Sequence, residues 1–147
     1  MATPALRTFC AINKGRPIPT QKPSSDHVQE TSLGMTATQI SLSNQQLEQL
    51  SAFEAMVRKE SKQQNLVSAG DLPNLRERHT EDSLQLLKIP YPSASERWLD
   101  MGCGAGFPLL PLAIALPAIR FTGVEPRGQR ARFLTRVVRE LGLEDRV

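Results

Sequence analysis

The sequence has few cysteines, histidines and aromatic residues, and it has no long apolar run. Its two cysteines, Cys10 and Cys103, lie far apart in 147 residues, and only His27 and His79 could join them at a metal. This pattern argues against a disulfide framework and a metal site, so we expect two reduced thiols and no metal. Because no run of about 18 apolar residues occurs, we expect no membrane span and no membrane partner. The 39% hydrophobic content suits one modest globular core.

Acidic residues are missing from the start of the chain. Residues 1–25 contain Arg7, Lys14, Arg16 and Lys22 and no Asp or Glu, so they carry a formal charge of +4, more than the net charge of +3 of the whole sequence. The remaining residues carry nearly equal numbers of basic and acidic side chains. We therefore do not expect a uniformly basic nucleic-acid-binding surface, and any basic patch must be local.

Residues 1–40 show no sustained periodicity and are rich in Thr, Ser, Pro and Gln, so we interpret them as a disordered N-terminal segment. The basic, hydroxyl-containing residues 1–25 have the composition of a transit peptide, which predicts the chloroplast or another organelle. An ordinary disordered tail explains the same composition, and the protein would then be cytoplasmic.

Residues 41–92 are predicted to form a small helical lid. Ser43 and Gln46 match a capping box, and the apolar residues that follow recur at helical spacing, which predicts a helix over about 44–62. A second helix is expected over about 74–87, and Pro90 and Pro92 then form a stiff connector.

Residues 93–147 are predicted to form the N-terminal half of a Rossmann-like α/β domain. A short strand around Trp98 leads into a glycine turn, and the apolar segment 109–116 predicts a helix that packs against a sheet. A second strand is expected over 119–124, followed by a third helix over about 128–142 with Gly142 as its cap. Parallel pairing and a right-handed crossover are strongly favoured for this β-α-β-α order. A doubly wound domain normally needs about five or more strands, so we expect a longer, C-terminally continued protein.

The glycine turn does not fit the dinucleotide-binding fingerprint. G-x-G-x-x-G requires a glycine where Phe107 or Leu109 stands, so both possible registers fail. The pattern that is present runs acid-x-G-x-G-x-G from Asp100 to Gly106, as is usual for class I methyltransferases that use S-adenosylmethionine. Glu125 ends the second strand about 20 residues further on, where a carboxylate could accept hydrogen bonds from both ribose hydroxyls.

Several side chains allow both a functional and a structural interpretation. Asp100 could bind the amino group of the cofactor, directly or through water, or it could cap the exposed amides of the turn. Arg132, Arg136 and Arg139 share one face of the last predicted helix, which could contact RNA phosphates or could simply be solvated. His79 could line a site or have a structural role.

Motifs in order along the chain resemble one protein family. They are residues 65–69, Glu77-Arg78-His79 with Asp82, residues 99–108, and Arg130 with Arg132-Phe133-Leu134. Over residues 44–147 this series is similar to the bacterial small-subunit rRNA guanine-N7 methyltransferases, also called the glucose-inhibited division protein B family. The Gly-Phe-Pro that ends the glycine loop distinguishes this family from most methyltransferases.

The resemblance implies a class I methyltransferase fold that uses S-adenosyl-L-methionine to methylate N7 of one guanine in 16S-type rRNA. Its partner would be this rRNA or the 30S-type ribosomal subunit. Two alternatives stay open: a truncated, non-catalytic isoform or fragment that retains rRNA or cofactor binding, and a methyltransferase with another substrate.

The motifs and the resemblance together nominate two sets of site residues. The cofactor-binding set is Asp100, Gly102, Gly104, Gly106, Phe107, Glu125, Pro126 and Arg127. The substrate or pocket-lining set is Arg78, His79, Asp82 and Arg130. The family usually has Asp followed by a small residue where this chain has Glu125 and Pro126, and Pro126 removes a backbone donor. Guanine N7 has a free lone pair and no proton to lose, so we nominate no catalytic acid or base and expect alignment to dominate.

Overall fold

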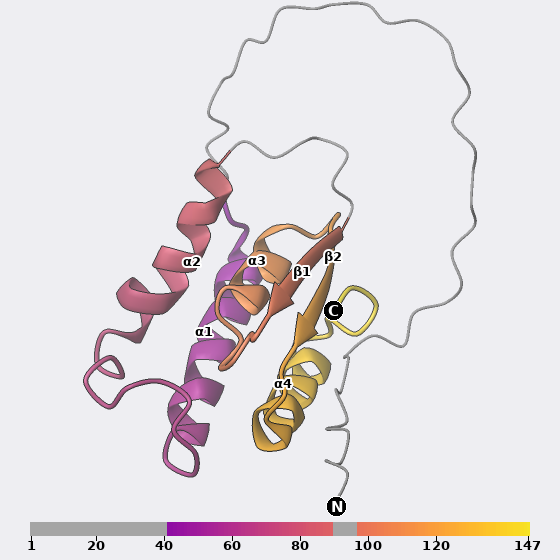
Figure 1. Ribbon diagram of the computed structural model, residues 1–147. Coiled ribbons are helices and arrows are strands. Elements are labelled where there is room, and N and C mark those ends of the chain that lie inside the picture. Colours follow the sequence, from indigo (N-terminus) through magenta and orange to yellow (C-terminus); the bar gives the residue numbers. More distant parts are fainter. Residues whose placement is uncertain (1–40, 90–96) are drawn as a thin grey trace, which may run out of the picture.

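The computed structural model describes residues 41–89 and 97–147 (Figure 1). The predicted transit peptide, the N-terminal segment 1–40 and the predicted connector at Pro90 and Pro92 lie outside the described residues. The elements are α1 (Asn44–Glu60), a π-helical turn η1 (Arg76–Glu81), α2 (Asp82–Gln85), a 3-10 turn η2 (Leu86–Lys88), β1 (Arg97–Met101), α3 (Leu109–Ala115), β2 (Arg120–Val124) and α4 (Gly128–Glu140).

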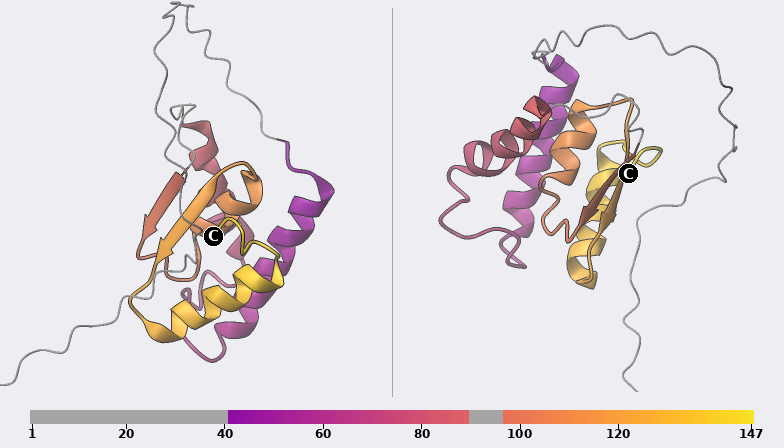
Figure 2. Two further views of the ribbon diagram at one scale, coloured as in Figure 1. Left: turned by 90° about the vertical axis from the view of Figure 1, so that its right-hand side faces the viewer. Right: turned by 45° about the horizontal axis from the view of Figure 1, so that its top comes forward.

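The two strands form a parallel sheet joined through α3, as the sequence predicts. Leu99 lies opposite Thr122, and Met101 lies opposite Val124. All seven residues of α3 are buried, because this helix packs against the sheet on one side and against α1 and α2 on the other. Figure 1 shows α1, α2 and α3 side by side, and the left view of Figure 2 shows α4 crossing α1.

The predicted capping box at the start of α1 is confirmed, and it also reaches across the fold. The Gln46 backbone N–H donates to Ser43 Oγ, and Gln46 Oε1 accepts from the Ser43 N–H at 2.8 Å. Gln46 Nε2 then donates to the carbonyls of Ile114 and Ala115 at the end of α3. Since those carbonyls have no partner within their own helix, the cap of one helix also completes the end of another.

The second predicted helix is present over Arg76–Lys88, and its course is irregular. The segment begins with the π-helical turn η1, continues as α2 and ends as the 3-10 turn η2. The Ser83 hydroxyl donates to the His79 carbonyl inside this segment, and a hydroxyl that bonds one turn back competes with the regular backbone ladder. The helix also buries Thr80 and Ser83 on its inner face.

The last helix ends in a Schellman motif. Gly142 has φ +66°, its N–H donates to Arg139 O, and the next N–H, that of Leu143, donates to Val138 O. This confirms Gly142 as the cap. The helices themselves are slightly shorter than predicted: α4 ends at Glu140 and α1 ends at Glu60, each two residues before its predicted end. Arg132, Arg136 and Arg139 are exposed, as the pattern predicts.

One basic side chain on that exposed face also has a structural role. Arg136 forms an ion pair with Glu60 at the end of α1 and lies 3.9 Å from Glu140 within its own helix. The pKa of the Glu60 carboxyl lies below its usual range, mainly because of a hydrogen bond from Gln64, with Arg136 adding to the effect. The helical part and the sheet part are therefore joined by a polar contact as well as by the shared core.

Candidate cofactor and substrate site

The glycine loop folds back over the end of the neighbouring strand. The N–H groups of Gly102 and Cys103 both donate to Val124 O, at 2.7 and 3.2 Å. Gly102, Gly104 and Gly106 all have positive φ, at +86°, +56° and +98°. Side chains other than glycine adopt this backbone conformation at a cost, so the alternate glycines are required by the path of the chain.

The glycines differ in what surrounds them. A Cβ on Gly106 would lie 2.7 Å from Leu110 Cδ1 and 3.0 Å from Leu134 Cδ2, so this residue lets the loop lie close to a side chain of α3 and a side chain of α4. A Cβ on Gly102 would meet nothing within 4 Å. Gly102 therefore presents open backbone at the surface of the loop, where a ligand can approach.

Gly123 in β2 packs against the glycine loop and the start of α3, and the sequence motifs did not indicate this role. A Cβ at this position would lie 2.5 Å from Leu109 Cδ2 and 3.0 Å from Cys103 Sγ. The missing side chain lets α3 approach β2. A lone glycine inside a strand pattern is the signal that could have indicated such a close approach.

Asp100 lies partly buried near the end of β1. Its carboxylate lies near the Leu109 N–H at the start of α3. Its Oδ2 atom is buried and has no hydrogen-bond partner. Burial raises the pKa of Asp100 above its usual value, with the Leu109 N–H opposing that shift. A buried acceptor without a partner is costly in a folded protein and calls for an explanation.

Glu125 receives one backbone hydrogen bond on each carboxylate oxygen. Its Oε2 atom accepts from the Gly104 N–H at 2.9 Å, and its Oε1 atom accepts from the Arg127 N–H at 2.8 Å. The side chain is only 5% exposed and joins the glycine loop to the start of α4. Because the donor is Arg127, the N–H that Pro126 lacks is not needed for this bridge. A carboxylate has about four acceptor positions, so Glu125 retains capacity for a ligand.

The two carboxylates produce negative potential below the loop. The pKa of the buried Cys103 thiol is raised to about 12, chiefly by burial and further by the charges of Asp100 and Glu125. Within the described residues, neither carboxylate forms an ion pair with a basic side chain. Both carboxylates therefore contribute negative charge at the glycine loop without an ion-pair partner among those residues.

A pocket of about 540 Å³ lies between the helical segment and the end of the glycine loop. It is lined by His79, Asp82, Ser83, Gln85, Leu86, Ile89, Phe107 and Pro108. The structure therefore brings together His79, Asp82 and Phe107, which come from both predicted sets. The Phe107 ring lies 5.1 Å from the His79 ring and 4.9 Å from the Phe53 ring, between centroids.

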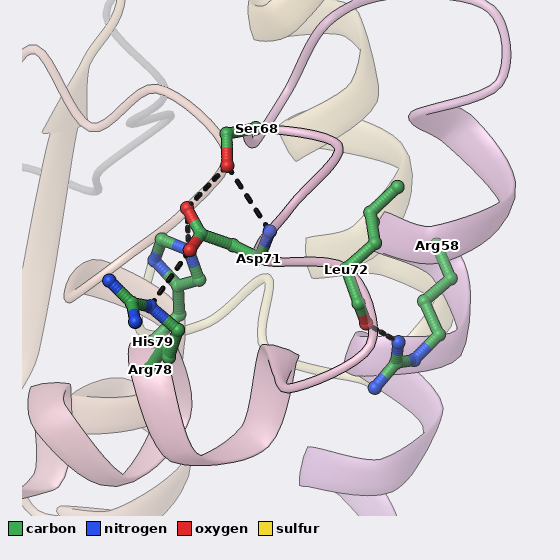
Figure 3. A network of polar contacts seen from close by, with 6 residues as sticks. All are labelled: Arg58, Ser68, Asp71, Leu72, Arg78 and His79. Atoms are coloured by element: carbon green, nitrogen blue, oxygen red, sulfur yellow. Dashed lines mark hydrogen bonds and ion pairs between the residues drawn. The ribbon is translucent and has the colours of Figure 1, made fainter.

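Arg78 and His79 are both drawn toward Asp71 (Figure 3). Arg78 Nε lies 2.8 Å from Asp71 Oδ1, and His79 Nε2 lies 3.6 Å from Asp71 Oδ2. Asp71 also accepts from Ser68 Oγ at 2.7 Å, and this bond, followed by the two basic neighbours, lowers the pKa of its carboxyl. Arg78 does not line the pocket, so in this structure it organises the loop before η1.

Arg130 lies on another side of the glycine loop. Its Nη2 atom donates to Asn65 O at 2.7 Å, and a Cβ on Gly104 would lie 3.8 Å from its Nη1 atom. It shares a smaller cavity, of about 230 Å³, with Arg127 and three polar residues. Sequence order alone could not separate Arg130 from His79 and Asp82, because the folding of α4 against α1 decides its place.

Two further findings bear on the site. The described residues contain no group of three or more His, Cys, Asp or Glu side chains placed to hold a metal ion. None of the helices in the described ranges has the length and apolar character that a membrane span needs.

The comparisons with known proteins agree on one family. A family model described as rRNA small subunit methyltransferase G (GidB) matches residues 46–146. A protein named Ribosomal RNA small subunit methyltransferase G from Pseudomonas aeruginosa (strain LESB58) is 38% identical over 117 residues, which are 80% of this chain and 54% of that protein. One of the same name from Marinobacter nauticus is 40% identical over 112 residues, covering 76% of this chain and 51% of that protein.

The chain thus spans about half the length of the curated relatives that it matches. The matched region contains both strands, the glycine loop, Asp100, Glu125 and the pocket residues. The mixed α/β unit with its parallel strand pair is the corresponding part of a class I methyltransferase fold. The chain belongs to the rRNA small subunit methyltransferase G (GidB) family.

Proposed function

We propose that this chain binds S-adenosylmethionine and belongs to an enzyme that methylates N7 of a guanine in small-subunit rRNA. The observation that carries the proposal is the buried Asp100 Oδ2 atom, which has no hydrogen-bond partner and lies at the start of the glycine loop. A ligand ammonium group would supply the missing donor, and a charge-assisted hydrogen bond is the strongest that a carboxylate can accept.

The charge of the site favours this cofactor over a dinucleotide. S-Adenosylmethionine carries a cationic sulfonium and an ammonium group, whereas a dinucleotide carries an anionic pyrophosphate. Asp100 and Glu125 together raise the pKa of Cys103, so both contribute negative potential at the loop. Opposite charges attract strongly where water is partly excluded, and like charges repel by a similar amount.

The residues present fit the cofactor in three places. Gly102 offers open backbone for the methionine portion, Asp100 offers an acceptor for its ammonium group, and Glu125 retains acceptor positions for ribose hydroxyls. The hydrogen bonds from Gly104 and Arg127 fix the Glu125 carboxylate in advance, so little ordering remains to be done on binding.

Methyl transfer to guanine N7 requires the protein mainly to align the two reactants. When bound, S-adenosylmethionine supplies an electrophilic methyl group, and guanine N7 supplies a lone pair. No proton has to leave N7, so the chain needs no general base. Its contribution is to hold both reactants in line at about 3 Å and to exclude water between them. The pocket beside Phe107 and Pro108, which continue directly from the glycine loop, offers a place for the second reactant.

The test combines a binding and a transfer measurement. Calorimetry on the 147-residue chain should show S-adenosylmethionine binding, which Asp100→Asn weakens and the exposed control Glu144→Gln leaves unchanged. Small-subunit particles lacking the modification, incubated with the chain and labelled cofactor, should gain 7-methylguanosine. Absence of binding would refute the cofactor proposal. Binding without transfer would favour the alternative of a non-catalytic form, and transfer to other RNA would favour the other substrate class.

We further propose that residues 1–25 direct the protein to the chloroplast or another organelle, on the basis of their basic, acid-free composition. Residues 1–40 fused to a fluorescent reporter would test this. Import into an organelle supports the proposal, whereas a diffuse cytosolic signal refutes it and returns the cytoplasmic alternative.

A further inference from the structure

The pocket between α2 and the glycine loop contains a carboxylate that nothing in the fold uses. Asp82 lines this pocket at the first residue of α2, and its side chain is exposed. Within the described residues its carboxylate forms no hydrogen bond or ion pair. Arg78, one turn before it, is paired with Asp71 instead. The Asp82 carboxylate is therefore available to a ligand.

The other polar groups of the pocket narrow the choice of ligand. The Ser83 hydroxyl already donates to the His79 carbonyl, and His79 Nε2 is buried 3.6 Å from Asp71 Oδ2 without a hydrogen-bond partner. Gln85, three residues after Asp82, is exposed, lines the same pocket and has no partner within the described residues. Residues three apart share one face of a helix, so the pocket presents an acceptor-only carboxylate next to an amide.

The remaining lining residues are apolar, and one of them is aromatic. Phe107, Pro108, Leu86 and Ile89 line the pocket, and the Phe107 ring is held by contacts with two other rings. A volume of about 540 Å³ lies in the usual range for small-molecule sites. Unstacked bases are generally held this way, with a face on an aromatic side chain and an edge on a few polar groups.

We propose that this pocket receives the target guanine and that Asp82 is the residue that selects it. The inference rests on the proposed function and assigns the part of the site that reads the base. Guanine presents two adjacent donors, N1–H and the N2 amino group, which match the two oxygens of a carboxylate. It also presents O6, which can accept from the Gln85 amide.

The same arrangement rejects adenine and leaves N7 free. Adenine has an acceptor at N1, which would face a carboxylate oxygen without a proton between them. A site built around such a hydrogen bond discriminates strongly, because the wrong base leaves its polar groups unpaired. N7 lies on the imidazole ring of guanine, away from N1 and N2. A base held at Asp82 by those two groups can therefore turn N7 toward the glycine loop that Phe107 and Pro108 continue.

The test measures base selectivity by NMR titration of the 147-residue chain with GMP, IMP and AMP. We expect GMP to bind about tenfold or more tightly than AMP, since it gains charge-assisted hydrogen bonds that AMP cannot form. IMP keeps N1–H but lacks the amino group, so it should fall between them. The shifted amide signals should include those of Gln85 and Phe107.

Asp82→Asn supplies the decisive variant. An amide offers one donor and one acceptor, which suits the Watson–Crick edge of adenine, so GMP should weaken and AMP should bind more tightly than to the wild type. A variant that had only lost structure would gain no affinity for AMP. Glu81→Gln, an exposed neighbour outside the pocket lining, is the matched control and should keep the preference for GMP.

The outcomes separate this inference from the proposed function. Equal binding of GMP and AMP, or an unchanged preference in Asp82→Asn, overturns the inference even when S-adenosylmethionine binds. A preference for GMP that Asp82→Asn reverses supports it. If that preference occurs in a chain that binds no S-adenosylmethionine, the proposed methyl transfer fails and the guanine site stands.

Discussion

Asp100→Asn should make this protein more stable while weakening its site. The substitution keeps an oxygen that can accept from the Leu109 N–H and removes the charge whose burial raises the pKa of Asp100. Leaving a buried polar group unsatisfied costs about 1–3 kcal/mol, and a charge costs more than a neutral group. Because Asp100 is only partly buried and the new amide also lacks a partner, we take the low end and expect a gain of about 1 kcal/mol near neutral pH.

The pH dependence identifies the cause of that gain. Since the pKa of Asp100 is raised on folding, the native state holds its proton to higher pH than the unfolded state does. The stability cost is absent below the unfolded value of about 3.9 and appears as pH rises through the folded pKa. The advantage of Asp100→Asn should therefore be small at about pH 4 and largest at neutral pH.

Urea unfolding at the two pH values, followed by circular dichroism, measures this difference. For a domain of about 100 residues, 1 kcal/mol corresponds to a rise in melting temperature of about 4–8 °C. Calorimetry on the same samples should show S-adenosylmethionine binding weakened about tenfold or more, because an amide cannot form the ion pair with the ligand ammonium. A variant that is less stable than wild type at neutral pH, or an advantage that does not change with pH, would refute the reasoning.

Further experiments test the glycine loop and the contacts of α1 with α3. Gly106→Ala should lower the free energy of unfolding in urea by about 2 kcal/mol or more, because it combines positive φ with two close side-chain contacts. Gly102→Ala has open space around it, so it should lose less stability and mainly weaken cofactor binding. Cys103, whose pKa is raised to about 12, should resist alkylation in the native chain and react once urea unfolds it, as peptide mapping would show; fast native labelling would contradict its burial. Gln46→Ala should cost more than the roughly 1 kcal/mol expected for Ser43→Ala, because it also removes the donor to two α3 carbonyls; equal losses would show that those contacts contribute nothing.

Local rules predicted much of the fold. The capping box at Ser43 and the cap at Gly142 follow from the hydrogen-bonding needs of the first and last turns of a helix, which neighbouring residues satisfy. The β-α-β pairing follows from the alternation of apolar segments with a glycine turn between them. Such features depend on residues within a few positions of one another, so they can be read along the sequence.

The unpredicted features depend on contacts between distant segments. The amide of Gln46 reaches the end of α3, and Gly123 is small because α3 approaches β2 there. The π-helical turn at η1 replaces a regular helix where Ser83 and Thr80 are buried. No local pattern contains this information, because each feature is fixed by what packs against it in the folded chain.

The same limit applies to the site. The sequence placed His79, Asp82 and Phe107 among the site residues from two separate motifs, and the fold brings them to one pocket. It could not indicate that Arg78 is held by Asp71 or that Arg130 lies elsewhere, beside Asn65. A motif gives the chemistry of a side chain, whereas its partners in the fold decide whether that chemistry is free for a ligand.

That distinction explains why Asp100, rather than Glu125, separates binding from folding. Both carboxylates lie at the carboxyl end of a strand beside the glycine loop, and both would be nominated for the cofactor from sequence alone. Glu125 receives a backbone hydrogen bond on each oxygen, so removing its carboxylate would leave the N–H groups of Gly104 and Arg127 without an acceptor and would disturb the loop itself. Asp100 keeps one buried oxygen without a partner. An unpaired buried acceptor lowers the free energy of unfolding, and its presence is explained if a bound ligand supplies the missing donor.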